Sequence, residues 1–270
     1  MNPEKVEELL NADREKLIRA VCVVHNETAT GVTSDISSIR KAVDRTDHPA
    51  LFMVDTISSL ASMDYRHDEW KVDVTVAGSQ KGLMLPPGLS FNAVSDKALE
   101  ASEKAQLPRA YWNWQEMLNA NEQSVFPYTP ATNLLYGLKE ALILLKEEGL
   151  DQVFARHCKL AQATRKAVQG WNLEMNALHS HEFSDSLTAV RMPEGHDADQ
   201  FRKVVLENFN VSLGNGLGKI QGKVFRIGHL GDFNAPMLLG TLGAIQMELQ
   251  HAGQPYKPKA EHAAMDELLK

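Results

Sequence analysis

The sequence predicts an α/β fold in which a mainly parallel sheet comes first and a smaller α+β half follows. In the first part of the chain, apolar runs rich in β-branched residues alternate with polar loops and helical patterns. This alternation is typical of right-handed βαβ crossovers and hence of parallel strands. After residue 147, long amphipathic helices are mixed with short apolar runs instead. We therefore expect two domains, at residues 1–147 and 148–270.

Composition and charge exclude several classes of function. The chain has 270 residues, of which 43% are hydrophobic and 23% charged, a profile typical of soluble globular proteins. Its net charge is −7 and it contains no basic block, so we expect no nucleic-acid or membrane partner. We find no signal peptide and no apolar run long enough to span a membrane, and therefore expect a cytoplasmic protein. The two cysteines, Cys22 and Cys158, lack the spacing of a disulfide framework or a zinc site.

Apolar periodicity places the elements of the first half. Short continuous apolar runs indicate buried strands, whereas apolar residues three or four positions apart indicate helices. Ser34 or Asp35 is a suitable N-cap for the second helix. In chain order, we expect a short helix behind Pro3, a strand at 20–24, a helix at 34–43, a strand at 50–54 and a strand that begins at Val74.

The clearest helical pattern runs over 132–148, where leucines share one face and Gly149 follows as a C-terminal cap. The more polar segment 96–122 is expected to be helical in pieces, with the pair Trp112 and Trp114 serving packing. The remaining expectations are a loop at 126–130, helices at 152–167, 198–208 and 236–251, strands at 187–191, 211–213 and 224–227, and a loose tail over roughly the last fifteen residues.

Residues 74–91 carry the most informative pattern. A small apolar strand leads into a Gly-Ser-Gln-Lys-Gly loop that contains Lys81, and a Pro-Pro-Gly turn and a second apolar run follow. A lysine hemmed in by apolar residues and glycines would be partly desolvated. Desolvation disfavours the ammonium form and favours the neutral amine that forms Schiff bases. The alternative is an ordinary surface lysine at the end of a strand.

Asp55 follows the strand at 50–54, where a partly buried carboxylate needs a cationic partner. One such partner is the protonated ring nitrogen of pyridoxal phosphate. The alternative is a helix N-cap, because Thr-Ile-Ser-Ser follows Asp55. Segments 25–30 and 79–81 also lie at the carboxyl ends of strands, where parallel sheets bind ligands. An Asp at a strand end, with a Ser-Gln-Lys-Gly loop one crossover later, is more specific than either residue separately.

Together these segments resemble a known family. VDTISSLAS around Asp55, GSQKGLMLPPGLSF around Lys81 and the HNETATG loop are similar to the class V branch of fold-type I pyridoxal-phosphate enzymes. The nearest resemblance is to serine–glyoxylate, alanine–glyoxylate and aspartate–glyoxylate aminotransferases. GKVFRIGHLG (222–231) and FPYTPATNLLYGL (126–138) extend it, so that it covers about 3–251. It implies a partial large, cofactor-binding domain followed by an α+β small domain.

The resemblance also implies roles for individual residues. Lys81 would bind pyridoxal phosphate covalently and, once released, move a proton at the substrate Cα. Asp55 would keep the pyridine nitrogen protonated. Thr28 would lie near the ring hydroxyl, although Asn26 and Thr30 in the same loop compete for that position.

Two further contacts of the cofactor are implied at its phosphate. Gln80 would touch the phosphate of the same subunit. Thr129 would reach the phosphate of the neighbouring subunit's cofactor, which implies a homodimer with shared active sites. Where relatives carry a tyrosine beside that threonine, this chain has Phe126, with Tyr128 as the candidate substitute.

Arg226 lies in the middle of the strand VFRI, an awkward place for a charge unless it faces an anion. A guanidinium binds a carboxylate with two parallel hydrogen bonds, and amino-acid and keto-acid substrates both carry one. The alternative is a salt bridge inside the small domain. The glycine-rich run 214–218 lacks phosphate-loop spacing, so we expect a flexible loop near the cleft. His67, His229 and the other histidines lack metal-ligand spacing and are expected to be surface or structural residues, with no metal site.

The implied reaction is ping-pong transamination, in which serine, aspartate or alanine donates its amino group and glyoxylate receives it to give glycine. A carbon–sulfur lyase of the same fold is one alternative. It needs a cysteine on a mobile loop, whereas Cys22 falls in an expected strand and Cys158 in an expected helix.

The second alternative is an impaired fragment that acts only with a partner chain. Chains of this family begin well before the residue that matches Met1. Roughly a hundred residues, about a small domain, are expected to have no counterpart here. In the family they include a helix N-terminus for the phosphate and an aromatic ring that stacks on the cofactor.

Overall fold

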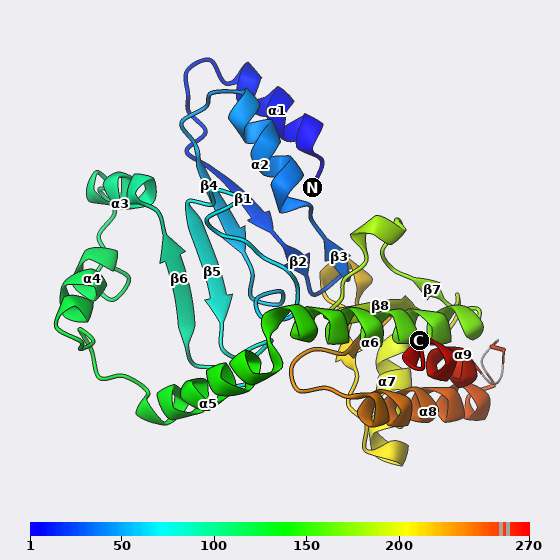
Figure 1. The fold of residues 1–270 in the computed structure, drawn as a ribbon. Coiled ribbons are helices and arrows are strands. Elements are labelled where there is room, and N and C mark those ends of the chain that lie inside the picture. The colour runs from blue at the N-terminus through cyan, green and yellow to red at the C-terminus, as the bar shows by residue number, and fades with distance from the viewer. Residues whose placement is uncertain (254–255, 258–259) are drawn as a thin grey trace.

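The computed structural model describes residues 1–253, 256–257 and 260–270 and contains two four-stranded sheets (Figure 1). The first sheet has the order β1–β4–β5–β6. Strands β1 (Ala20–Val24), β4 (Leu51–Asp55) and β5 (Val74–Gly78) are parallel, and β6 (Ser90–Val94) is antiparallel. The α/β class and the mainly parallel first sheet that the sequence predicts are thus confirmed.

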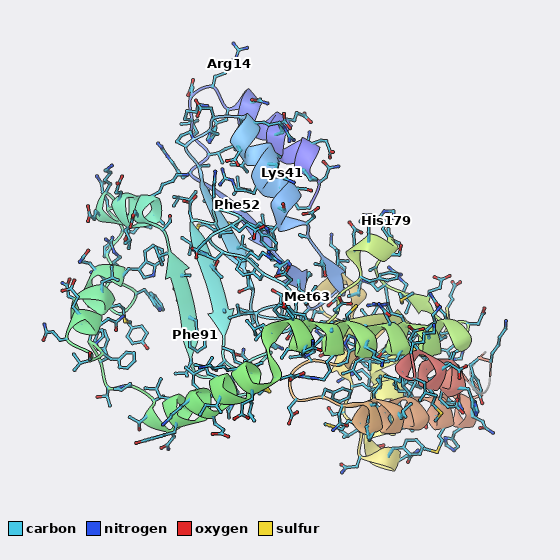
Figure 2. All side chains as sticks on the ribbon, in the orientation of Figure 1. Arg14, Lys41, Phe52, Met63, Phe91 and His179 are labelled. Carbon is cyan, nitrogen blue, oxygen red and sulfur yellow. The ribbon has the colours of Figure 1, made fainter. Side chains whose placement is uncertain are left out.

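Two helices cover one face of this sheet. Helix α1 (Pro3–Ala12) begins at Asn2, whose side chain accepts a hydrogen bond from the Lys5 amide, and α2 (Ile36–Arg45) is capped by Asp35 rather than Ser34. Their apolar faces pack on β4, where Phe52 is completely buried (Figure 2). Burial of this stripe, rather than helix propensity, holds such short helices in place.

Beyond β6 the chain forms an arm that stands away from the sheet (Figure 1). The arm consists of α3 (Asp96–Glu103), α4 (Trp114–Glu122) and the loop that leads to α5 (Thr132–Glu148). Every residue of α4 is exposed or only partly buried. Trp112 is 83% exposed, so the expectation that it serves packing is wrong within this chain.

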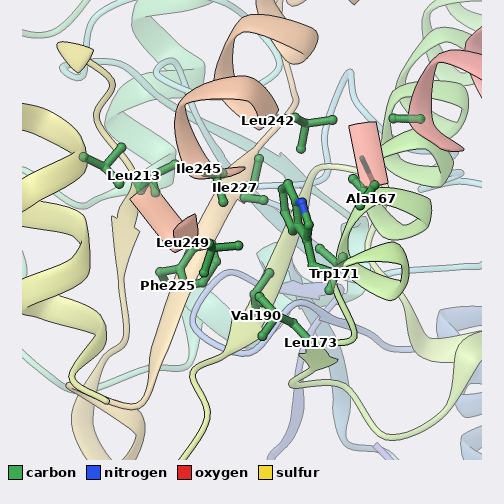
Figure 3. Packing of buried hydrophobic residues seen from close by; sticks show 14 of the residues in the cluster. Ala167, Trp171, Leu173, Val190, Leu213, Phe225, Ile227, Leu242, Ile245 and Leu249 are labelled. Atoms are coloured by element: carbon green, nitrogen blue, oxygen red, sulfur yellow. The ribbon is translucent and has the colours of Figure 1, made fainter. Parts of the chain in front are cut away.

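The second sheet is antiparallel and has the order β7–β8–β10–β9. Its strands are β7 (Glu174–Met175), β8 (Leu187–Arg191), β9 (Gly214–Asn215) and β10 (Val224–Gly228). The helices around it are α6 (Leu150–Gly170), α7 (Ala198–Phe209), α8 (Ala235–His251) and α9 (Ala260–Leu268). Figure 3 shows the core between them, in which Trp171, Phe225 and Leu249 are fully buried.

Three expectations about this half are wrong. The strand expected at 211–213 is instead β9, because backbone pairing with β10 begins only at Gly214. The run 214–218 is therefore partly an ordered edge strand and not a flexible loop. The expected loose tail contains α9, whose buried Ala260 and Ala264 join the core beside α6. A Cβ on Gly170 would lie 2.7 Å from the Cβ of Ala260, so only glycine permits this approach. Residues 258–259 of that tail lie outside the described residues.

A small hairpin connects the two halves. Strands β2 (Asn26–Glu27) and β3 (Val32–Thr33) leave the end of β1 and reach the second sheet, where Val32 forms a bridge with Phe183. Gly31, with φ +71°, lets the hairpin turn approach β8 closely, because a Cβ there would lie 3.3 Å from the Cβ of Ala189. The domain boundary expected at 147/148 lies one residue before Gly149, the junction of α5 and α6, and remains a prediction.

Within the described ranges, no helix is long and apolar enough to cross a membrane.

Candidate active site

Three loops meet at the carboxyl ends of the parallel strands. Val24, Asp55 and Val76 are register partners across β1, β4 and β5, so the segments that follow these strands leave the sheet side by side. They are the HNETATG loop, the turns after Asp55 and the lysine loop, which we define as residues 79–89. This is the edge at which a parallel sheet binds ligands.

Asp55 is partly buried at the end of β4. Its Oδ1 accepts a hydrogen bond of 2.8 Å from the Ile57 amide, and turns rather than a helix follow. Within the described part of the chain, no cationic side chain forms an ion pair with Asp55. The capping alternative thus accounts for one carboxylate oxygen and leaves the negative charge without a partner.

The lysine loop is held in shape by Ser79, which is completely buried. The Ser79 hydroxyl donates to the Pro86 carbonyl at 2.8 Å and accepts from the Leu89 amide at 3.1 Å. Gly82 brings the loop onto the turn after Asp55, because a Cβ there would lie 2.2 Å from the Leu60 carbonyl oxygen. These contacts explain why a serine stands two residues before Lys81 and a glycine directly after it.

Lys81 itself is partly buried, unlike an ordinary surface lysine at a strand end. Its ammonium group makes no hydrogen bond or ion pair to any residue that the structure describes. The neighbouring Gln80 is exposed. The predicted Schiff-base lysine is therefore close to the Asp55 turn, with its amine free of protein partners in the described residues.

The HNETATG loop offers three candidates for the ring hydroxyl. Asn26 is buried, and its amide donates to Ser58 and Ser186 at 2.8 Å each, so it is used in joining the two halves. The Thr30 carbonyl accepts from Asn176, which orients Thr30 toward the second sheet. Thr28 remains, partly buried, with its carbonyl 2.7 Å from Nη1 of Arg226. The hydrogen bonds of Thr28 and Thr30 involve their carbonyls and not their hydroxyls, so the role of Thr28 at the ring hydroxyl stays a prediction.

Arg226 lies on β10 and runs past Gly214, where a Cβ would lie 3.0 Å from its Nε. Nη1 donates to the Thr28 carbonyl, whereas Nε is buried and finds no hydrogen-bond partner among the described residues. Burial and, to a smaller extent, Arg202 lower the pKa of Arg226. The alternative salt bridge inside the small domain is absent from the described residues, so this guanidinium has donors left for an anion.

His25 was expected, like the other histidines, to be a surface or structural residue, and the structure places it beside the turn after Asp55. It is buried at the end of β1, where Nδ1 lies 2.9 Å from the Ser59 hydroxyl, and its ring packs against Tyr65 and Trp70. Burial lowers the pKa of His25 to about 4. It is therefore neutral at physiological pH and supports the turn that follows Asp55. Its position directly after an apolar strand was the available signal.

The contacts expected at the phosphate of a neighbouring subunit lie on the arm. Thr129 and Phe126 are exposed there. The Tyr128 hydroxyl donates to Glu116 at 3.3 Å, and its ring packs 5.2 Å from that of Tyr111. No hydrogen bond joins Thr129 to Lys81 among the described residues, and the contact of Thr129 with a neighbouring cofactor stays a prediction.

The cysteines occupy regular elements, as expected. Cys22 lies in β1, and Cys158 lies in α6, where its sulfur accepts a hydrogen bond from Gln162 at 3.2 Å. Burial raises the pKa of Cys158, which disfavours the reactive thiolate. A lyase nucleophile on a mobile loop is thus not supplied by these two residues. Among the described residues, no cluster of three His, Cys, Asp or Glu could hold a metal ion.

Comparison with known proteins identifies the family. The family model "Aminotransferase class-V" matches residues 1–226. The chain is 49% identical to serine–glyoxylate aminotransferase of Methylorubrum extorquens, covering 99% of this chain and 68% of that protein. It is 45% identical to L-aspartate–glyoxylate aminotransferase of Paracoccus denitrificans, covering 98% and 67%. The solved structure of pyridoxamine–pyruvate aminotransferase from Mesorhizobium loti superposes with a TM-score of 0.91 at 32% identity, covering 99% and 69%.

The chain thus spans about two thirds of the length of these relatives. The alignments to the two relatives and the superposition each cover nearly all of this chain. This agrees with the resemblance carried by the motifs around Asp55 and Lys81. The chain belongs to the class V aminotransferase family and has its fold-type I α/β architecture.

Proposed function

We propose that the chain is a pyridoxal-phosphate-dependent aminotransferase that moves an amino group from serine, aspartate or alanine to glyoxylate. Relatives at 45–49% identity are named for this reaction with serine or aspartate as donor. One structural observation carries the proposal most directly. Asp55, Lys81 and Arg226 converge at one edge of the fold, and no ion pair occupies any of them within the described residues.

The residues present fit pyridoxal phosphate. Asp55 offers a carboxylate without a cationic partner, Lys81 offers an amine, Thr28 offers a hydroxyl and Gln80 offers an exposed amide for the phosphate. When bound, the cofactor supplies an electron sink that stabilises negative charge on the substrate Cα. A pyridoxal-phosphate ring needs a carboxylate and a nucleophilic amine at separate positions, and Asp55 and Lys81 offer these two groups.

Each protein group then has a defined task. The Asp55 carboxylate keeps a proton on the ring nitrogen. Nζ of Lys81 takes the proton from the substrate Cα. It then returns the proton to the carbon atom to which the amino nitrogen has been transferred. The Arg226 guanidinium binds the substrate carboxylate and so orients the Cα–H bond toward Lys81. Because amino acid and keto acid share that carboxylate, one arginine serves both half-reactions.

We also propose a cytoplasmic homodimer with shared active sites. Support comes from the arm, where large apolar side chains are exposed around Thr129. They are Leu107, Tyr111, Trp112, Leu118, Val125, Phe126 and Tyr128. Such a concentration of exposed apolar surface marks an interaction site. A partner subunit bound to the arm would place Thr129 near the neighbouring cofactor. The division into domains 1–147 and 148–270 would put the cofactor between two separate sheets.

A second candidate is an impaired fragment that acts only with another chain. Two observations favour it. The chain spans about two thirds of its relatives, and both β1 and β6 are edge strands of the first sheet, each hydrogen-bonded on one side. Added polypeptide could pair with either edge. In this case the site residues would be the same, but cofactor binding would require the second chain.

Covalent labelling of Lys81 tests the proposal. The purified chain is incubated with pyridoxal phosphate, reduced with borohydride and digested, and the labelled peptide is identified by mass spectrometry. We expect a label on Lys81 and glycine formation from glyoxylate, both lost in Lys81→Ala and retained in Lys41→Ala, which changes an exposed lysine of α2. A label spread over surface lysines refutes the proposal. Labelling that appears only after a polypeptide covering the unmatched third of a relative is added supports the fragment instead.

A further inference from the structure

The loop after β10 connects two of the charged residues of the candidate site, Arg226 and Lys81. β10 carries Arg226, and five residues later Gly231 reaches the lysine loop. The position of a Cβ on Gly231 is 3.8 Å from the Lys81 carbonyl oxygen and 3.5 Å from Cγ of Met84. Gly231 adopts φ +80°, which favours glycine. Gly231 therefore faces the loop that presents Lys81, so close that even a Cβ would be in van der Waals contact with it.

His157 holds Gly231 from the other side. The ring is completely buried in α6, and its Nδ1 donates to the Val153 carbonyl at 2.7 Å. That bond leaves Nε2 as an acceptor, which receives the Gly231 amide at 2.9 Å. Burial lowers the pKa of His157, so the ring stays neutral and Nε2 remains an acceptor at neutral pH.

Arg156, the preceding residue, binds the other backbone group of Gly231. Its Nη1 donates to the carbonyls of Gly231 at 2.8 Å and Phe233 at 3.1 Å. Glu148, at the end of α5, accepts from Nε at 2.7 Å and from Nη2 at 2.9 Å and so orients the guanidinium. Two consecutive side chains of α6 thus satisfy both polar backbone groups of Gly231.

The chain between Arg226 and Gly231 is pinned as well. The His229 amide donates to the Ser186 carbonyl at 3.0 Å. Its buried ring donates through Nδ1 to the Asp185 carbonyl at 3.2 Å and accepts from Thr188 at 3.0 Å. The path from Arg226 to the lysine loop is therefore fixed at His229 and again at Gly231, with little freedom between these points.

We propose that His157 is a positioning residue for transamination, which sets the placement of Lys81 relative to Arg226 by holding Gly231 against the lysine loop. The inference rests on the proposed function, in which Arg226 orients the substrate for proton transfer by Lys81. Displacement of a reacting group by about 1 Å costs on the order of 100-fold in rate. A buried histidine that touches neither group can therefore control the reaction.

Hydrogen exchange tests the structural part of this inference without cofactor or turnover. His157→Phe keeps a ring but removes the acceptor, and His157→Gln offers an oxygen in its place. We expect exchange of the Gly231, Met84 and Leu85 amides to accelerate at least tenfold in the phenylalanine variant, and the glutamine variant to recover most of the protection. Thr164→Val is the matched control, since Thr164 is also completely buried in α6 but donates to the Leu160 carbonyl.

Kinetics test the functional part. In His157→Phe we expect borohydride labelling of Lys81 to persist while kcat for transamination falls at least tenfold, and His157→Gln to lie within about threefold of the original chain. Should the phenylalanine variant not fold, Arg156→Lys repeats the comparison, because lysine cannot bind Glu148 and Gly231 together.

Unchanged exchange over residues 81–85 in His157→Phe, or an equal change in Thr164→Val, overturns the inference. An unchanged kcat together with faster exchange also overturns it, because the loop would then move without consequence for the reaction. Failure of the proposed function looks different. In that case the original chain itself is not labelled at Lys81, and the positioning role falls with it even if the exchange result shows that His157 holds the loop.

Discussion

Unpartnered charges define the candidate site at the scale of single residues. A charged group that is partly buried costs free energy unless a ligand or another side chain compensates for it. Arg226 is the clearest case, because its buried Nε finds no acceptor within the described residues. Asp55 and Lys81 show the same pattern without ion pairs there. A cationic ring would partner Asp55, a substrate carboxylate would partner Arg226, and the covalent bond to the cofactor would use the amine of Lys81.

Replacement of Arg226 should weaken the use of both substrates. Hydrogen bonds to charged groups contribute about 1.5–3 kcal/mol, so Arg226→Gln is expected to lower kcat/KM for donor and glyoxylate by about 10- to 100-fold. Arg226→Lys should fall in between, because lysine keeps the charge but loses the planar fork. Steady-state kinetics measure this. Arg191→Gln, an exposed arginine on the neighbouring strand β8, is the control, and an equal loss there would contradict the assignment.

Buried histidines should make the fold sensitive to acid. Burial lowers the pKa of His25 to about 4 and that of His229 to about 3, from an ordinary value of 6.5. Between these values the unfolded chain binds more protons than the folded chain. Stability is therefore complete above pH 6.5 and falls as the pH falls, by about 1.4 kcal/mol per pH unit for each histidine. For His25 the loss is complete near pH 4.

Urea unfolding at pH values between 7.5 and 5 measures this slope. His25→Gln should show a shallower decline than the original chain, because one depressed histidine is removed. His181→Gln, at an exposed position, should leave the slope unchanged. A free energy of unfolding that is constant over this range, or that rises as the pH falls, would contradict the assignment of neutral buried rings.

At the scale of elements, close backbone contacts decide how the loops of the site meet. The lysine loop is tied to itself through Ser79 and to the turn after Asp55 through Gly82. Neither contact involves a charged group, yet both determine where Lys81 lies. The position of Lys81 thus depends on small residues that allow close backbone packing and take no part in the chemistry.

Gly82→Ala should separate the lysine loop from that turn. The new methyl group would lie 2.2 Å from the Leu60 carbonyl and 2.5 Å from the Ser62 hydroxyl, and the backbone must move to accept it. We expect about 1–3 kcal/mol of destabilisation and reduced labelling of Lys81 by pyridoxal phosphate and borohydride. Gly240→Ala in α8 is the control, because it meets open space and should stabilise that helix by about 0.5–1 kcal/mol. Undiminished labelling in Gly82→Ala would refute the packing argument.

At the scale of the whole molecule, contacts within the chain do not explain the exposed apolar surface of the arm. Its helix α4 buries no residue fully among those described, and the nearby Tyr111, Trp112, Phe126 and Tyr128 are exposed. The second half of the chain differs, because its helices enclose one continuous core (Figure 3). Exposed aromatic surface of this kind is expected to be covered in the assembled protein.

Self-association through the arm is testable at Trp112. We expect Trp112→Arg to weaken the dimer at least tenfold in sedimentation equilibrium, since tryptophan and other aromatic anchors dominate interface energies. Leu178→Arg is the matched control, because Leu178 is similarly exposed, at 82%, but lies in the other half of the chain. Equal dimer affinities for the two variants would place the interface elsewhere.

Local sequence patterns determined most of the secondary structure. The helix at 132–148 and the strands at 20–24 and 187–191 are found at the expected residues, because periodicity and β-branching act over a few neighbours. The two-residue strand β9 and the helix α9 were not foreseen. The first exists through pairing with β10, and the second through packing beside α6.

The sequence by itself also carried the family resemblance, through the motifs around Asp55 and Lys81, and its βαβ pattern placed both residues at strand ends. Only the tertiary structure joined Arg226 to the Thr28 carbonyl, and only it connected His157 to Gly231. These contacts join residues far apart in the chain, 198 positions for Arg226 and Thr28 and 74 for Gly231 and His157. No local pattern encodes such a separation, since the contact forms only when the two halves of the fold pack together.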